Sequence, residues 1–263
     1  MKLLSILTFI CILSSSLFSF SDQDIDGVDD AHDLCSNTPF DVTVNEKGCP
    51  YNQNNTKNFI FQIGEDISFN SSSEKTNTLN LFLNYTYKQW DFSLSSSNYN
   101  ITNINTVFDT EDDFYLTTGY LLQKNKFKTK ISVGTKFAFM DNDSIKRDND
   151  YFISINIDYF INQKQNIFFY PSYTWSGDSN TTHYKNFSSF SLGTGYALTS
   201  KWYSAFSYNY TQLPYSDIKP HKSISWVNYY ILPHDFYIYC NYAYTLNKSS
   251  YTHLVSLNIG VKF

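Results

Sequence analysis

From residue 57 to the C-terminus, apolar and polar residues alternate along the chain with a period of two. In the segment YFISINIDYFI, residues 151–161, the isoleucines fall on one face while Ser154, Asn156 and Asp158 fall on the other. In the segment 127–139, three lysines share one face in the same way. A helix would scatter these residues around its axis, whereas a strand collects them on one side. The pattern therefore predicts β-strands with one polar and one apolar face.

Twelve such segments follow one another, and the connections between them alternate in length. After every second segment the chain turns within about two to four residues, as in KQ, KNK and TSK, and the other connections are mostly longer and polar. All short turns then fall at one end, as in an antiparallel outer-membrane β-barrel with periplasmic turns and extracellular loops. The predicted strands are 57–70, 77–87, 90–101, 113–123, 127–140, 151–161, 166–176, 187–198, 202–212, 223–232, 236–246 and 252–263.

A soluble all-β protein could also alternate, but three features favour an all-β transmembrane barrel over residues 57–263. The strands are about twice as long as the five or six residues usual in soluble sheets. Trp90 and Trp202 lie at the short-turn side, and Trp175 and Trp226 lie near the loop side, as in two interfacial aromatic girdles. The ending at Phe263, with apolar residues at every second position before it, resembles the signal that the barrel assembly machinery of bacteria reads.

The first 21 residues have the layout of a secretory signal peptide. Lys2 precedes an apolar stretch at residues 3–13, and small residues follow it. A membrane anchor is the alternative, but about eleven apolar residues fall short of the roughly twenty that a spanning helix needs. Without Lys2, 18 of the 19 basic residues remain against 24 acidic ones, a net charge of −6. No basic patch points to nucleic acid.

The acidic run DQDIDGVDDAHD at residues 22–33 places carboxylates at alternate positions of a twelve-residue loop. This spacing lets them converge on one hard cation, and the glycine at position 6 permits the sharp turn. The candidate Ca²⁺ ligands are Asp22, Asp24, Asp26, the carbonyl of Val28, Asp30 and Asp33. A solvated acidic tail is the alternative. The helices that flank an EF-hand loop are absent from the sequence pattern.

Residues 22–50, DQDIDGVDDAHDLCSNTPFDVTVNEKGCP, resemble a thrombospondin type 3 repeat in the single-copy form of bacterial envelope proteins. The sequence departs from the family pattern at Ser36, Asp41 and Asn45, but it keeps the matched aspartates and both cysteines. The resemblance implies bound Ca²⁺ and a disulfide between Cys35 and Cys49. Residues 51–56 read as a linker. An even number of strands then puts this Ca-binding module in the periplasm of a Gram-negative cell.

The lumen-lining candidates are the polar residues on the face opposite the apolar one. Those that carry the functional argument are Lys128, Lys130, Lys136, Asn156 and Asp158. Clustered lysines would favour anions in a low-dielectric pore. Internal neutralisation is the alternative, because Asp158 is expected near Lys130 on the neighbouring strand.

Twelve strands enclose a lumen narrower than that of a general porin, so a narrow channel for small solutes, with anions among the candidates, is the main functional prediction. A structural or adhesin-like barrel without an open pore is the first alternative. The second is a lipid-modifying enzyme resembling outer-membrane phospholipase A, for which His221, Ser223 and Asp235 are the only candidates. They fall at opposite ends of one predicted strand, whereas catalytic partners must be in hydrogen-bond contact. The prediction is therefore a barrel that is not an enzyme.

Three places in the alternating pattern need an interpretation of their own. Glu65 falls on the apolar face of its strand, so we expect a bulge or an interfacial position there. The strand at 223–232 has apolar residues on both faces, and its register stays open. Cys240 is expected to face lipid as a small apolar residue.

Overall fold

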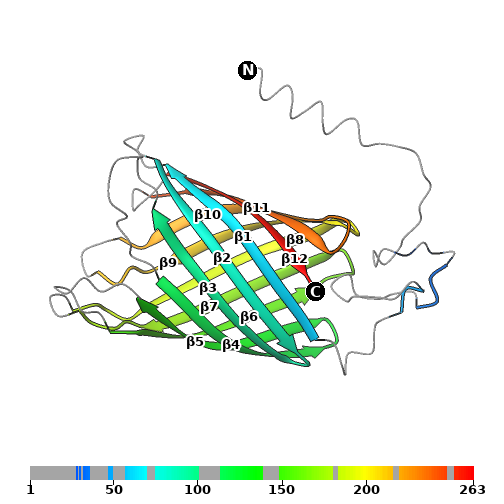
Figure 1. Cartoon of the computed structure of the whole chain (residues 1–263), viewed down its shortest axis with the longest axis horizontal. Helices are drawn as coiled ribbons and strands as arrows, with labels where there is room; N and C mark the ends of the chain where they lie inside the picture. Colours follow the sequence, from blue (N-terminus) through cyan, green and yellow to red (C-terminus); the bar gives the residue numbers. More distant parts are fainter. Residues whose placement is uncertain are drawn as a thin grey trace, which may run out of the picture.

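A computed structural model describes twelve β-strands and part of the N-terminal segment (Figure 1). The described residues are 28, 30, 32–35, 47–49, 57–69, 75–100, 113–138, 148–179, 183–215, 219–247 and 252–263. The strands are β1 (Lys57–Phe69), β2 (Lys75–Tyr87), β3 (Trp90–Asn100), β4 (Asp113–Lys124), β5 (Phe127–Ala138), β6 (Asp150–Phe160), β7 (Gln165–Trp175), β8 (Phe187–Thr199), β9 (Trp202–Thr211), β10 (His221–Ile231), β11 (Phe236–Thr245) and β12 (His253–Lys262). The predicted signal peptide, residues 1–21, and linker, residues 51–56, lie outside the described residues.

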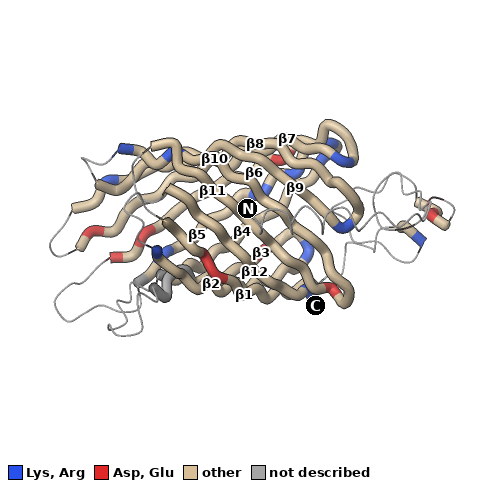
Figure 2. The backbone as a smooth tube through the Cα atoms, turned by 90° about the horizontal axis from the view of Figure 1, so that it is seen from above, with Lys and Arg blue, Asp and Glu red and all other residues tan. Residues whose placement is uncertain are grey.

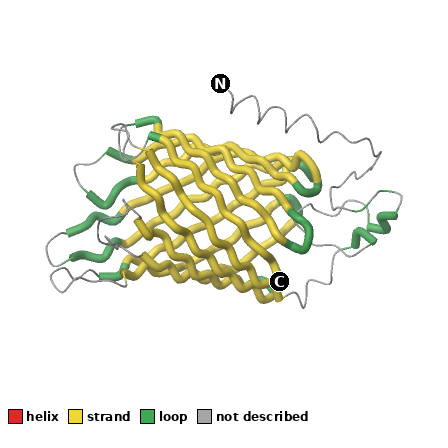
Figure 3. The backbone as a smooth tube through the Cα atoms, turned by 45° about the horizontal axis from the view of Figure 1, so that its top comes forward, coloured by secondary structure: helices red, strands yellow, loops and turns green. Residues whose placement is uncertain are grey.

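Each strand pairs with its neighbours in the sequence, and β1 pairs with β12 to close the barrel. All pairs are antiparallel, and the tilted strands form one continuous wall (Figures 1 and 3). The closing seam runs in register from Ile60 opposite Lys262 to Phe69 opposite His253. Because closure removes both sheet edges, the backbone groups of the wall bond within the barrel. The prediction of a twelve-stranded antiparallel barrel is confirmed.

The outward face of the barrel is apolar, and its large side chains are uncovered. Val133, Phe206 and Leu257 are 56–57% exposed, a degree that is unusual for so many aliphatic and aromatic residues in water. The inward face instead carries small and polar residues such as Ser132 and Ser256, at most 6% exposed. Charged residues lie mostly toward the two ends of the barrel (Figure 2). This polarity is the reverse of a soluble core, and it fits a wall with hydrocarbon outside.

The short turns lie at one end of the barrel and bend within two to four residues. Lys88, Asn125, His234 and Asp235 have positive φ angles of 52–61°, which favour tight reversals in three of these turns. Five short turns join β2 to β3, β4 to β5, β6 to β7, β8 to β9 and β10 to β11.

Among the described residues, none forms a helix long and apolar enough to cross a membrane.

Two tryptophans on the outward face donate their indole N–H groups within the wall. Trp202 Nε1 donates to Asn228 Oδ1 over 3.1 Å, and Trp226 Nε1 donates to the hydroxyl of Ser204 over 2.9 Å. A donor facing hydrocarbon needs such a partner, since lipid tails offer none. These pairs explain how Asn228 and Ser204 occupy a mostly apolar face.

The register settles the two strands that the sequence left open. In β10, Ser223 and Ser225 share the inward face of the wall with Asn209 of β9, and Trp226 faces outward. In β1, pairing runs without a break from Lys57 to Phe69, so Glu65 does not lie in a bulge, and an interfacial position stays the prediction for this residue. The hydrogen bonds of a regular strand outweigh the cost of one outward carboxyl. Glu65 stays on the outward face, and Cys240 is likewise outward and half-buried.

The outward position of Glu65 generates a stability prediction. Its cross-strand neighbours are Leu79 and Leu257, so Glu65→Leu should complete an apolar surface. We expect a gain of about 1 kcal/mol in the free energy of unfolding in phospholipid vesicles, because acidic residues cost less than the ~2–4 kcal/mol of a basic residue at the bilayer centre. Denaturant titration of tryptophan fluorescence measures this gain. Ile63→Leu, two residues away on the same face, is the matched control. Loss of stability in Glu65→Leu would mean that the carboxylate has a partner.

Candidate functional site

The inward face of β3–β6 carries lysines and aspartates that pair with one another. Lys130 Nζ lies 3.3 Å from Asp91 Oδ1, and Lys136 Nζ lies 3.7 Å from Asp150 Oδ2. Asp150 is nearly inaccessible, with 7% of its side chain exposed, so this ion pair is shielded from water. Lys130 lies toward the short turns and Lys136 toward the loop end of β5. The wall therefore holds one ion pair toward the short turns and another toward the loop end.

Asp91 is the centre of a small network. Besides Lys130, it accepts hydrogen bonds from Asn84 Nδ2 over 2.7 Å and from the Thr86 hydroxyl over 3.4 Å. Lys130 reaches Asp91 from two strands away by crossing β4 at Gly119. A Cβ at Gly119 would lie 3.2 Å from the Lys130 side chain and 2.7 Å from the Ser132 hydroxyl. Glycine at this inward position thus makes room for the ion pair.

The sequence places Asp158 near Lys130, and the register refines this expectation. Asp158 lies directly opposite Lys128, whereas Lys130 lies opposite Asn156 and reaches away from Asp158, to Asp91. The pleat sets this difference, because only the residue directly opposite comes closest across an antiparallel pair. All five predicted lumen residues, Lys128, Lys130, Lys136, Asn156 and Asp158, lie at inward positions of β5 and β6.

Asp158 also links the charged wall to a tyrosine-rich wall. Its Oδ1 accepts hydrogen bonds from Tyr170 Oη over 2.8 Å and from Asn166 Nδ2 over 2.9 Å. Asn166 Oδ1 in turn accepts from Tyr203 Oη over 2.9 Å. Tyr203 of β9 reaches Asn166 of β7 by lying across Gly195 of β8, where a Cβ would collide with the phenol group. Periodicity alone does not reveal this link, although a glycine at an inward position hints at it.

A second tyrosine crosses the wall near the β1–β12 seam. Tyr237 of β11 lies over Gly260 of β12 and donates from its hydroxyl to Gln62 Oε1 on β1 over 2.9 Å. Its ring packs on Tyr229 with centroids 4.9 Å apart, and Tyr237 is only 6% exposed. These large rings lie along the inner face and narrow the space between the walls.

From β7 to β11, no described inward position carries Lys, Arg, Asp or Glu. Toward the loop end this wall holds a chain of neutral groups. Ser191 Oγ donates to Asn209 Oδ1 over 2.7 Å, and Asn209 Nδ2 donates to Ser225 Oγ over 2.7 Å. The lumen thus has one charged wall and one neutral wall.

The residues considered for lipid hydrolysis do not come together. His221 is the first residue of β10, and Asp235 lies in the turn beyond its other end. Ser223 is 3% exposed, and its register partner on β9 is Asn209.

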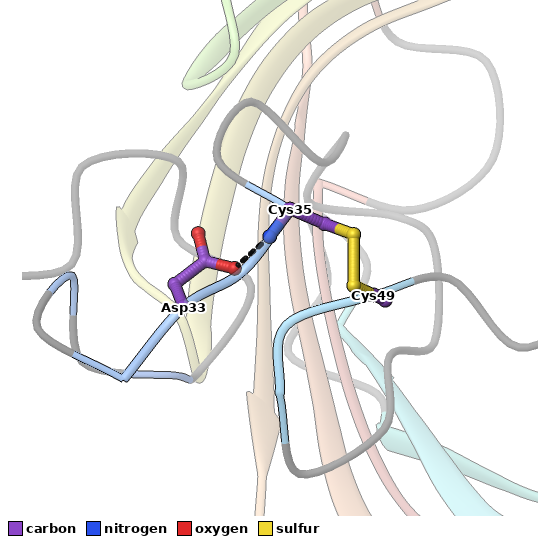
Figure 4. The surroundings of a disulfide bond; sticks show 3 residues. All are labelled: Asp33, Cys35 and Cys49. Carbon is purple, nitrogen blue, oxygen red and sulfur yellow. Dashed lines mark hydrogen bonds between the residues drawn. A yellow bond between two sulfur atoms is a disulfide. The ribbon is translucent and has the colours of Figure 1, made fainter.

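The described part of the N-terminal segment contains the disulfide that the resemblance implies. Cys35 and Cys49 are bonded, and Asp33 Oδ1 accepts a hydrogen bond from the Cys35 N–H over 2.8 Å (Figure 4). Val28 and Asp30 are also described, but Asp22, Asp24 and Asp26 lie outside the described residues. The described carboxylates are hard oxygen donors of the kind that Ca²⁺ takes.

The predicted assembly residue, Phe263, ends the chain beside β1. Its backbone exchanges hydrogen bonds with Phe59, over 2.8 and 3.2 Å, and the two rings are 6.0 Å apart. Phe263 therefore extends the closing seam by one further pair.

Solved structures of outer-membrane channels share this fold. An outer-membrane channel from Pseudomonas putida F1 aligns with a TM-score of 0.61 at 11% identity, over 81% of this chain and 99% of that chain. The NanC porin aligns at 0.55 and 15% identity, over 78% and 98%. The KdgM porin in complex with disordered oligogalacturonate aligns at 0.53 and 7% identity, over 78% and 98%. No protein-family model and no curated protein matches the sequence.

The crossing of Tyr203 over Gly195 generates a double-mutant prediction. Gly195→Ala should displace the tyrosine from Asn166 and cost about 1–3 kcal/mol, as overpacking does. In a Tyr203→Ala background the same glycine change should cost about 0.5 kcal/mol or less, because its obstacle is gone. Unfolding titrations of the four proteins in detergent give the coupling energy. Equal costs in both backgrounds would show that Gly195 acts independently of Tyr203.

Proposed function

We propose that the protein is a narrow channel that passes small solutes across the outer membrane. The observation that carries this proposal is the polar inward face of a closed barrel whose outward face is apolar. Polar residues are costly inside a membrane protein unless they contact water, one another or a solute. Twelve strands enclose more space than the eight-stranded barrels that side chains fill, and less than 16-stranded porins enclose.

The similarity to three outer-membrane channels supports both the location and the activity. One of them is in complex with disordered oligogalacturonate. The lysines of this chain first suggest anions as solutes, and ion selectivity measures that directly.

A barrel without an open pore, acting in structure or surface interaction, is the second candidate. It is favoured by the close packing of inward rings, since Phe168 and Tyr237 are 7% and 6% exposed. The conductance experiment below separates the two candidates.

Conductance in a planar lipid bilayer tests the channel. We expect stepwise single-channel currents smaller than those of 16-stranded porins, because the lumen is narrower. Tyr203→Ala should increase the step size, since it removes a ring from the lumen wall, and the outward Tyr173→Ala serves as the control. A folded barrel, shown by heat-modifiable migration on gels, that gives no current would support the structural role instead.

We also propose that residues 22–50 bind Ca²⁺ in the periplasm, and that the assembly machinery recognises the strand ending in Phe263. The support for the ion site is the ligand spacing together with the disulfide. The disulfide holds the end of the acidic run against residue 47, where Leu34 N–H donates to the Lys47 carbonyl over 2.9 Å. Lipid is the partner of the outward face.

The Ca²⁺ proposal predicts a loss of binding without loss of the barrel. Asp24→Ala combined with Asp26→Ala should abolish heat of Ca²⁺ binding in calorimetry, because two of the alternate carboxylates disappear. Heat-modifiable migration should stay unchanged. Asp41→Ala, outside the ligand spacing, is the control. Undiminished binding in the double variant would exclude this loop as the site.

A further inference from the structure

We propose that the solute of this channel is uncharged and rich in hydroxyl or amide groups, and that it travels along the neutral wall formed by β7–β11. This inference rests on the channel proposed above, but it reverses the solute charge that the lysines first suggest. It depends on three features of the lumen: compensated charges, a neutral wall that runs between the two mouths, and polar atoms left without partners in that wall.

The charges of the lumen compensate one another. Among inward residues whose side chains the structure describes, lysines and aspartates are equal in number, with four of each. They are Lys128, Lys130, Lys136 and Lys262, and Asp66, Asp91, Asp150 and Asp158. Lys130 and Lys136 are each in an ion pair, and Lys128 is directly opposite Asp158. Closely paired charges produce a field that falls off within a few ångströms, so they attract neither sign of ion from a distance.

The neutral wall offers hydrogen-bonding groups along its length. Tyr203 lies toward the short turns, and Ser191 and Asn209 lie toward the loop end, and all three are only partly buried. An ion that enters a narrow lumen loses hydration that only opposite charges or many dipoles replace. A solute with hydroxyl or amide groups loses less, because single donors and acceptors replace its water contacts.

Among the described residues of this wall, two buried side-chain oxygens have no hydrogen-bond partner. They are Asn241 Oδ1 and Thr245 Oγ1, both buried and both at inward positions of β11. Ala243, which lies between them on the same face, is 3% exposed, and Thr245 is 5% exposed. Buried polar atoms are rarely left unpaired, so each needs water or a passing ligand. An amide oxygen accepts a hydrogen bond from a hydroxyl or an N–H, whereas it repels an anion that has no proton to donate.

Two measurements on the full-length protein test the inference. The first is the reversal potential in a potassium chloride gradient across a planar bilayer, where we expect a cation-to-anion permeability ratio of about one. The second is swelling of protein-loaded liposomes, which should be at least several-fold faster in arabinose than in gluconate. A strongly anion-selective channel that excludes arabinose would overturn the inference and leave the channel intact. A barrel that carries neither ions nor arabinose would overturn both.

Substitutions of single residues test which parts of the lumen determine ion selectivity and arabinose entry. Asp91→Asn leaves Lys130 without its carboxylate and should shift the reversal potential toward anion selectivity, while the double variant Asp91→Asn with Lys130→Gln should return it to the starting value. Asn241→Leu should slow arabinose entry several-fold and leave the reversal potential unchanged. The outward neighbour Tyr242→Phe is the control. If Asp91→Asn left selectivity unchanged, the ion pairs would not be what neutralises the lumen, and the inference would fail. Because the double variant keeps the net charge, it also shows whether any change in Asp91→Asn reflects charge rather than misfolding.

Discussion

Every backbone N–H and C=O group inside a bilayer must find its partner within the protein, and the rest of this structure depends on that constraint. An open sheet would leave two edges unpaired, each group costing several kcal/mol in hydrocarbon. The pairing of β1 with β12 removes both edges, and the strand-to-strand backbone bonds then repeat around the wall. Once the wall is closed, successive side chains of each strand point alternately to lipid and to the lumen. The two-residue period of the sequence therefore sets both the apolar outward face and the polar inward face. The outward Glu65 shows the strength of this constraint, since β1 keeps its regular pairing rather than bulge to spare one carboxyl.

Closure also sets how the inward residues meet. In a barrel of this size, long side chains lie along the wall and reach strands two positions away, provided that the strand between them carries glycine. Lys130 crosses Gly119, Tyr203 crosses Gly195 and Tyr237 crosses Gly260. Each crossing ends in a polar contact, so the glycines convert a row of separate strands into an interlocked inner surface. The same crossings narrow the lumen and pair its charges, which links the packing of the wall to the selectivity that we propose.

The strands, their number and the inward placement of the lysines could be predicted from the sequence, because each follows from a local period of two. The alternating lengths of the connections predicted that the short turns lie at one end of the barrel. The sequence did not allow the partners of those lysines to be predicted. Lys130 and Asp91 are 39 residues apart in the sequence. Their contact depends on the register of the strands and on a glycine in the strand that lies between them. In β10, both faces carry apolar residues, so only pairing with Asn209 and its neighbours fixes which side faces the lumen. In the N-terminal segment the Cys35 to Cys49 disulfide is confirmed, whereas the Ca²⁺ ligands Asp22, Asp24 and Asp26 lie outside the described residues and stay a prediction.

The central claim is that hydrocarbon covers one face of each strand while the lumen lies behind the other. Nitroxide labels on single cysteines at residues 254–259 of β12, in a Cys240→Ser background and reconstituted in phospholipid vesicles, test it most directly. Collision rates with oxygen, which concentrates in lipid, should be high at 255, 257 and 259 and low at 254, 256 and 258. Collision rates with a water-soluble nickel complex should not follow the same pattern. Equal oxygen collision rates at all six positions would contradict the account.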